Sequence, residues 1–165
     1  MVDSVQSKIE GLEELLGKLE SVTDDVKRKG GRSALRKAAQ LIANKAKEGA
    51  SRIDDPETGR SIAGNITLRW NGRLFKRTGD LGFRVGVMHG AIVRVKGNPD
   101  QGVNGPTPHW RLLEFGTKFM PAQPFMRSAL ADNISEATRT FVTEYTKAIE
   151  RAIKRARKKS AQGAT

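Results

Sequence analysis

Apolar residues recur at helical spacing in three stretches of the chain. The first stretch covers residues 3–22, where the steps between apolar positions alternate between four and three and acidic residues lie on the opposite face. We expect an amphipathic helix there. It would pack on its own domain or extend as an arm onto a neighbouring subunit. Its apolar face consists of Val5, Ile9, Leu12, Leu15, Leu16 and Leu19.

The second stretch follows the segment KRKGG at 27–31, whose adjacent glycines are poor residues for a helix interior. A second helix is therefore predicted from Ser33, as its N-terminal cap, to about Gly49. Its inward face is rich in alanine, so another element can approach it closely. That face consists of Leu35, Ala38, Ala39, Ile42 and Ala46.

The third stretch begins near Pro124, because proline favours the first turn of a helix. The apolar spacing persists for more than 25 residues and predicts one long helix. It runs into a basic C-terminal tail at 151–165. The repeating positions are Leu130, Ile134, Ala137, Phe141, Tyr145, Ala148 and Ala152.

Between the second and third helices, partial alternation of apolar and polar residues predicts strands. They are GNITLRW at 64–70, LGFRVGVM at 81–88, AIVRVK at 91–96 and HWRLLEF at 109–115. The link His89-Gly90 suits a tight hairpin, and 97–107 is a long loop rich in glycine and proline. Because strands are grouped rather than alternating with helices, the expected class is α+β. We predict an antiparallel sheet of about four strands, flanked by two N-terminal helices and one long C-terminal helix.

Composition narrows the choice of partners. The 165 residues predict a single domain spanning 1–165, with only 37% hydrophobic residues and a net charge of +12. A modest core of this kind is often completed by partner subunits. The positive charge favours polyanions or acidic protein surfaces and does not choose between them. Cysteine is absent, which excludes disulfides and thiolate chemistry. No run reaches the roughly 18 apolar residues of a membrane span, so we expect no membrane partner.

Catalytic and metal-binding patterns are missing from the sequence. His89 and His109 have no carboxylate or histidine companions at ligand spacing, and no serine lies in a GxSxG turn. We therefore expect no enzyme activity, no metal and no cofactor. Glu114 is the one acid in an apolar run, without a second carboxylate nearby. Its expected roles are structural, either a pair with an arginine or a cap on the following FGT turn.

The C-terminal tail is the strongest electrostatic feature of the chain. One interpretation is a solvated helix end, where cations suit the helix dipole. The other is contact with DNA phosphates or with an acidic partner, which would be independent of base sequence and salt-dependent because no base-reading motif accompanies it. The cations concerned are Arg151, Lys154, Arg155, Arg157, Lys158 and Lys159.

The stretch HWRLLEFGTKFMPAQPFMRSAL resembles the signature of a phage structural family, the tail-completion or head–tail joining proteins of long-tailed double-stranded DNA phages. That pattern is an aromatic-bearing strand ending in Glu-Phe-Gly-Thr, a short loop, and a Pro-x-Pro-Phe start to a helix with an alanine-leucine pair. The matching residues are Glu114, Phe115, Gly116, Thr117, Pro121, Pro124, Phe125, Ala129 and Leu130. The segments IEGLEELLGKLESV, TGRSI and FRVGV resemble weaker family features.

The resemblance implies a non-enzymatic virion protein of the tail or neck, assembled in the host cytoplasm. It would form a homo-oligomeric ring, typically hexameric, between the tail-tube protein and the head connector or stopper protein. Genome DNA would pass through the lumen without being read. The alternative is a standalone basic DNA-binding protein without sequence specificity.

On this interpretation the family stretch forms a rigid corner between the sheet and the last helix. Gly116 allows a backbone conformation that is closed to other residues, Pro121 and Pro124 stiffen the exit, and Glu114 is the polar lock. The expected corner and interface residues are Glu114, Phe115, Gly116, Thr117, Pro121, Pro124 and Phe125.

Overall fold

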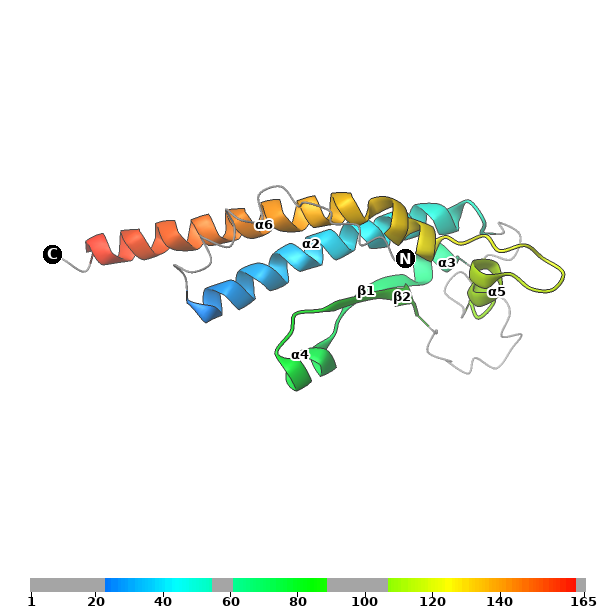
Figure 1. The fold of residues 1–165 in the computed structure, drawn as a ribbon, viewed down its shortest axis with the longest axis horizontal. Helices are drawn as coiled ribbons and strands as arrows, with labels where there is room; N and C mark the ends of the chain where they lie inside the picture. Colours follow the sequence, from blue (N-terminus) through cyan, green and yellow to red (C-terminus); the bar gives the residue numbers. More distant parts are fainter. Residues whose placement is uncertain (1–22, 55–60, 89–106, 163–165) are drawn as a thin grey trace, which may run out of the picture. The chain divides into compact units, whose positions relative to one another are not determined.

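The computed structural model of the chain describes residues 23–54, 61–88 and 107–162. These residues form an α+β fold in which helices dominate (Figure 1). The elements, in chain order, are α2 (Asp24–Ser51), α3 (Ile62–Asn65), β1 (Ile66–Trp70), α4 (Gly72–Thr78), β2 (Phe83–Val87), α5 (Trp110–Phe115) and α6 (Met126–Gln162). The long C-terminal helix that the sequence predicts is confirmed, and it begins two residues after Pro124.

The described residues divide into two compact units. We call the first the basic unit; it contains residues 23–38, 73–82 and 135–162. We call the second the corner unit; it contains residues 39–54, 61–72, 83–88 and 107–134. The helices α2 and α6 contribute residues to both.

In the basic unit, α2 and α6 run side by side in opposite directions (Figure 1). The sequence prediction that Gly30 and Gly31 precede the helix is wrong, because both lie within α2. A Cβ at Gly30 would lie 3.2 Å from Ala148 Cβ and 3.3 Å from Tyr145 Cε2. The glycines therefore make room for a close crossing of α6, and packing offsets the roughly 1 kcal/mol that a glycine costs within a helix.

The alanine-rich face of α2, which the sequence predicts another element can approach closely, contributes buried residues to both units. Ala34 and Ala38 are buried in the basic unit, and Ala46 and Ala50 are buried in the corner unit. The core of the corner unit joins α2, α3, β1 and the start of α6. Its buried members are Ala46, Ala50, Ile62, Ile66, Phe125 and Ala129.

The sheet of the described residues has two antiparallel strands, β1 and β2, rather than the predicted four. Ile66 pairs with Val87, Leu68 with Val85 and Trp70 with Phe83, so the apolar positions of both strands share one face. The Trp70 and Phe83 rings meet edge to face with centroids 5.2 Å apart. The sequence predicts both strands at these places.

The predicted fourth strand, HWRLLEF at 109–115, is a helix instead, α5. Short apolar runs do not distinguish strand from helix. The helical form turns Trp110 and Leu113 toward the core, one turn apart, and leaves Leu112 and Phe115 exposed. The short helices α3 and α4 were not predicted. The first predicted helix at 3–22, the hairpin link His89-Gly90, the third strand at 91–96 and nearly all of the loop at 97–107 lie outside the described residues.

Candidate functional site: the corner between α5 and α6

Glu114, near the end of α5, is almost fully buried, with 1% of its surface exposed. Its carboxylate accepts hydrogen bonds from the backbone N–H groups of Phe125, Met126 and Arg127, at 2.8, 2.9 and 3.0 Å. Phe125 immediately precedes α6, and Met126 and Arg127 are its first residues, so these N–H groups have no partner within that helix. The carboxylate therefore caps α6 from another element, where the helix dipole also favours a negative charge.

Arg127 completes the environment of Glu114. Its Nε donates to Glu114 Oε1 at 3.1 Å, and its terminal nitrogen donates to the Glu114 carbonyl oxygen at 2.5 Å. The pair with an arginine that the sequence left open is thus confirmed. The alternative expectation, a cap on the FGT turn, is wrong, because the carboxylate caps the start of α6 instead. The sequence analysis did not identify Arg127 as the partner. Its position two residues after Phe125 of the Pro-x-Pro-Phe pattern is the signal that could have indicated it.

Two opposing effects act on the Glu114 carboxyl group. Burial alone raises its pKa, because a charge is poorly solvated inside a protein. The hydrogen bonds from the Met126 and Arg127 N–H groups, the Arg127 side chain and the Phe125 N–H outweigh burial and hold the pKa below its ordinary value. These contacts favour the ionised form of Glu114, which suits its role as a cap on α6.

Gly116 ends α5 and turns the chain. Its φ of 74° and ψ of 176° lie in a region that residues with a side chain avoid. A Cβ at this position would lie 2.8 Å from the Ala122 nitrogen and 3.0 Å from the Met120 carbonyl oxygen. The glycine is thus required both by conformation and by space. The Gly116 N–H still donates to the Leu112 carbonyl at 2.8 Å and closes the helix.

The segment between Gly116 and α6 is held by backbone hydrogen bonds. Thr117 N–H donates to the Met120 carbonyl at 2.8 Å, and Gln123 N–H donates to the Leu113 carbonyl at 2.7 Å. Pro121 and Pro124 are exposed in this segment. The structure thus brings all seven predicted corner residues together. Phe125, however, is 4% exposed and belongs to the core of the corner unit.

The large apolar side chains that are exposed in the described residues all belong to the corner unit. Four of them lie on α5 and α6, and we call these four the corner patch. The fifth, Phe119, lies in the intervening turn, is 91% exposed and is not counted in the patch. Leu130 and Ile134 were predicted as part of the apolar stripe of the long helix, yet more than half of each is exposed. The corner patch consists of Leu112, Phe115, Leu130 and Ile134.

Arg127 connects the two halves of the corner patch. Its guanidinium carbon lies 5.0 Å from the centroid of the exposed Phe115 ring, a cation–π contact. The same side chain therefore pairs with the buried Glu114 on one side and covers an exposed ring on the other. The corner is fixed from within, while its outer surface is apolar with a cationic rim.

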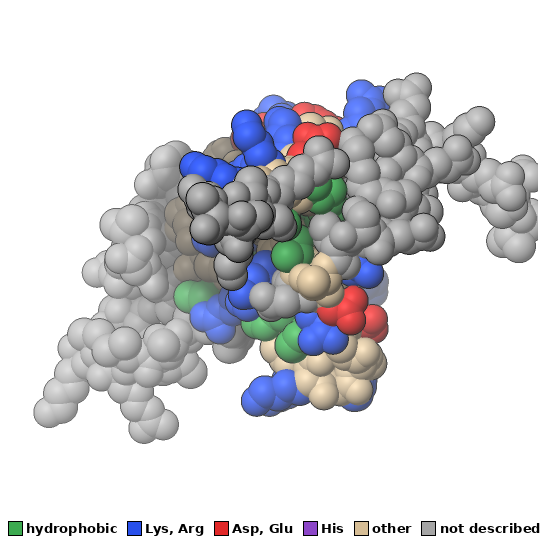
Figure 2. All heavy atoms as spheres, turned by 90° about the vertical axis from the view of Figure 1, so that its left-hand side faces the viewer, with side chains coloured by type: hydrophobic (Ala, Val, Ile, Leu, Met, Phe, Trp, Pro, Cys, Tyr) green, Lys and Arg blue, Asp and Glu red, His purple; other side chains and the backbone are tan. Residues whose placement is uncertain are grey.

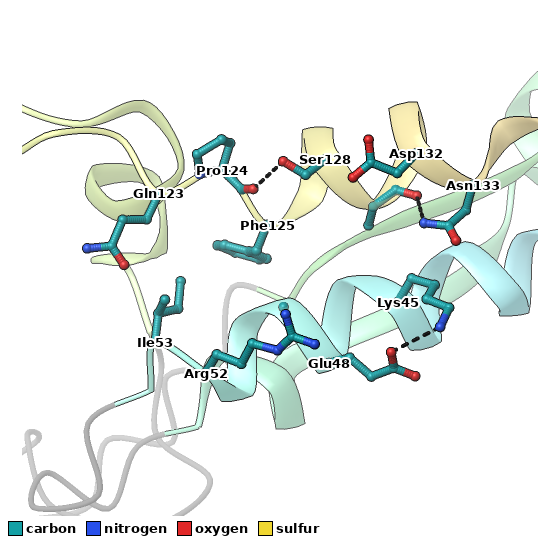
Figure 3. A pocket seen from close by; sticks show the side chains of 12 residues that line it. Lys45, Glu48, Arg52, Ile53, Gln123, Pro124, Phe125, Ser128, Asp132 and Asn133 are labelled. Carbon is teal, nitrogen blue, oxygen red and sulfur yellow. Dashed lines mark hydrogen bonds and ion pairs between the residues drawn. The ribbon is translucent and has the colours of Figure 1, made fainter.

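A groove lies on another part of the corner unit, between the end of α2 and the start of α6 (Figure 3). Phe125, just before α6, points into it, and Arg52 and Ile53, just after α2, face it. Its polar groups pair locally: Lys45 with Glu48 at 3.2 Å, and Ser128 Oγ with the Pro124 carbonyl at 2.6 Å. Within the described ranges no cluster of three His, Cys, Asp or Glu side chains could hold a metal ion.

The basic unit carries the other predicted site. Its described residues contain 17 Lys and Arg against 6 Asp and Glu, whereas those of the corner unit contain 8 against 4. Figure 2, which views the molecule from the left-hand side of Figure 1, shows separate groups of Lys and Arg side chains on the described part of this face, and fewer acidic ones. The predicted tail continues α6 to Gln162, where the exposed predicted cations are Arg151, Lys154, Arg155 and Lys158.

The acids of the basic unit partly neutralise this surface. Glu144 on α6 pairs with Lys37 of α2 and, at 3.5 Å, with Lys147. The hydrogen bond from Lys37 is the main cause of a lowered pKa at Glu144. Beyond Glu150, α6 carries basic residues and no acid, so positive charge is most concentrated toward its C-terminal end.

Comparison with known protein families matches residues 13–116 to the family described as "Bacteriophage HK97-gp10, putative tail-component". The class of protein that this match defines is a bacteriophage tail component. Because the match covers more than half of the chain, the protein belongs to the HK97-gp10-like family. The match ends at Gly116, so α6 lies beyond it. Comparisons with curated proteins and with solved structures found no significant match. Among the described helices, none has the length and apolar character needed to cross a bilayer.

Proposed function

We propose that this tail component is a tail-completion subunit. Copies of the chain form a ring, hexameric in our proposal, between the tail-tube protein and the head connector or stopper protein. The ring completes the tail in the virion and joins it to the head. Genome DNA passes through its lumen, and the chain acts by binding rather than by catalysis.

One observation carries this proposal beyond family membership. The large exposed apolar side chains of the described residues gather in the unit whose corner is locked by Glu114, Gly116 and Arg127. A ring is built from heterologous contacts, in which one patch of a subunit docks on a different patch of the next. A stiff corner with an apolar outer surface suits such a contact. An interface that removes apolar side chains from water is stabilised by their burial.

The positive charge of the basic unit supports a role in contacting DNA or an acidic protein partner. The surface has no base-reading motif, so its interaction with DNA would be electrostatic and independent of sequence. The same charge favours a second candidate function, a standalone basic DNA-binding protein. The two candidates differ in assembly: the first requires oligomers or incorporation into particles, and the second requires neither.

Phage particles provide the direct test. Particles produced without this chain should accumulate DNA-filled heads and separate tails, and supplying the chain should restore joined particles. Electron microscopy of wild-type particles with a tagged chain should place the tag at the neck. In parallel, sedimentation velocity over a range of protein concentrations should show association. Joined, infectious particles in the absence of the chain would overturn the proposal, and a strictly monomeric chain with tight duplex binding would favour the second candidate.

A further inference from the structure

We propose that the N-terminal segment, residues 3–22, of one copy docks as an amphipathic helix on the corner patch of a neighbouring copy. This inference rests on the proposed ring, and it names the two surfaces that would meet in it. The observations behind it are the exposed apolar side chains of the corner unit and the pattern of apolar and acidic residues in the segment.

The corner patch is a continuous surface. Leu112 and Phe115 lie one turn apart on α5, and Phe115 contacts Arg127 at the start of α6. From Arg127, Leu130 and Ile134 follow at helical steps of three and four, so they lie on the same face of α6. Exposed fractions of 52, 62, 52 and 55% for Leu112, Phe115, Leu130 and Ile134 leave the patch open within the described residues.

The N-terminal segment has the complementary pattern. Its apolar positions form one stripe from Val5 to Leu19, which would be about 21 Å long at the helical rise of 1.5 Å per residue. The α6 part of the patch, Arg127–Ile134, extends about 10 Å by the same measure, and α5 lengthens it. Docking of an amphipathic helix by its apolar face is a common mode of recognition, with anchors at steps of three and four.

Charge favours the same pairing. Residues 1–22 contain five acids and two bases, whereas the rest of the chain is strongly basic. Arg111, Lys118 and Arg127 border the patch and are exposed. The basic unit offers more positive charge, but its described residues expose no large apolar side chain that could receive Leu12 and Leu16. The corner patch supplies both apolar surface and cations.

A ring also requires this kind of exchange between copies. Its interface joins two different surfaces of the same chain, and closure depends on each copy offering both. The segment and the corner patch are such a pair. The segment would therefore bind in trans, from one copy to the next.

Cysteine cross-linking provides a sharp test, because the native chain contains no cysteine. A copy with Leu12→Cys is mixed with a differently tagged copy with Leu130→Cys and treated with a short bismaleimide. We expect a cross-linked species carrying both tags. Two controls use the same chemistry: Glu14→Cys, on the opposite face of the segment, and Arg155→Cys, in the basic unit. Each control pairing should give several-fold less product.

A second measurement uses assembly itself. Leu12→Asp places a carboxylate in the proposed contact and should weaken self-association roughly tenfold or more, while Glu14→Gln should leave it unchanged. Circular dichroism of both variants checks that the fold is retained. Unchanged self-association with Leu12→Asp, or after removal of residues 1–22, would overturn this inference and leave the proposed ring standing.

The remaining outcomes also decide the matter. Cross-linking confined to single chains that carry both Leu12→Cys and Leu130→Cys would show the segment folding onto its own patch. Equal product with Arg155→Cys would show a preference for charge over apolar surface. Either result would overturn docking between copies. If the full chain never associates and is absent from particles, the proposed function fails, and this inference fails with it.

Discussion

The two compact units of this protein use acidic residues in opposite ways. In the corner unit, Glu114 is buried, accepts hydrogen bonds from three backbone N–H groups at the start of α6 and pairs with Arg127. In the basic unit, Glu144 lies at the surface between Lys37 and Lys147. The first carboxylate fixes the geometry of a chain reversal, whereas the second moderates a positive surface. The acidic residue of the corner unit therefore determines backbone geometry, and that of the basic unit determines surface charge.

The largest expected effect concerns the glycines with positive φ, of which the described residues of each unit contain one. Gly116→Val should destabilise the protein by about 3 kcal/mol or more, because the new side chain adds a clash with the Ala122 nitrogen to a strained backbone. Urea unfolding followed by circular dichroism measures this change.

Gly79 supplies the matched control. Its φ is 79°, and a Cβ there would meet nothing within 4 Å. Gly79→Ala should therefore cost only the conformational strain, about 1–2 kcal/mol, and Gly116→Ala should cost clearly more. Equal losses for the two alanine variants would show that the close packing of the corner contributes nothing.

Glu114→Gln is expected to cause the next largest loss of stability. The amide keeps the shape of the side chain but removes the charge that α6 and Arg127 stabilise, so we expect a loss of about 3 kcal/mol in the free energy of unfolding. Glu144→Gln is the control in the basic unit and should cause little change, since its ion pairs are at the surface. A similar small effect for both variants would contradict the role of Glu114 as the lock of the corner.

Low pH should remove the stabilisation that the Glu114 charge provides. The lowered pKa means that the folded state favours ionised Glu114, so its stabilisation is fully present above the ordinary glutamate pKa, near 4.5. It is lost as the pH falls below that value and through the lower folded-state pKa. Wild-type and Glu114→Gln stabilities, measured from pH 7 down to about pH 3, should therefore converge. A constant difference across this range would rule out a contribution from the charge.

Neutralising the end of α6 tests the basic unit. The triple change Lys154→Ala, Arg155→Ala and Lys158→Ala should weaken binding to duplex DNA roughly tenfold or more and reduce its salt dependence. It should leave stability unchanged, because these side chains are exposed, whereas Ile153, which packs against the Val142–Ile149 cluster, is retained. Fluorescence anisotropy at several salt concentrations measures binding. Lys45→Ala with Lys47→Ala in the corner unit is the control, and an equal loss there would deny the basic unit a special role.

The smallest effect is expected at the crossing of α2 and α6 in the basic unit. Tyr145 OH donates to the Lys27 carbonyl at 2.9 Å, while its ring packs on Gly30 and Gly31. Tyr145→Phe removes only the hydrogen bond and should cost about 1 kcal/mol. Gly30→Leu would instead push against Ala148 and the ring and should cost more. Thermal unfolding of the two variants distinguishes hydrogen bonding from close packing.

The sequence alone predicted the features that depend on local pattern. The period of apolar residues indicated the long helix α6, and alternation indicated β1 and β2 at their observed places. The signature around Glu114 and Gly116 predicted a corner and the phage tail family, and the family match confirms that assignment. These features can be predicted from the sequence because spacing, turn residues and motifs act over a few neighbouring positions.

Tertiary contacts decided the rest. The run WRLLEF fits a strand or a helix, and the helix prevailed where Trp110 and Leu113 pack on the core and Glu114 reaches the first N–H groups of α6. Gly30 and Gly31 look like a helix break, yet α2 continues because Tyr145 and Ala148 need the space they leave. The apolar stripe of α6 did not reveal that Leu130 and Ile134 are exposed. Each of these outcomes depends on residues distant in sequence, whose packing energy exceeds local preference and cannot be read from one segment.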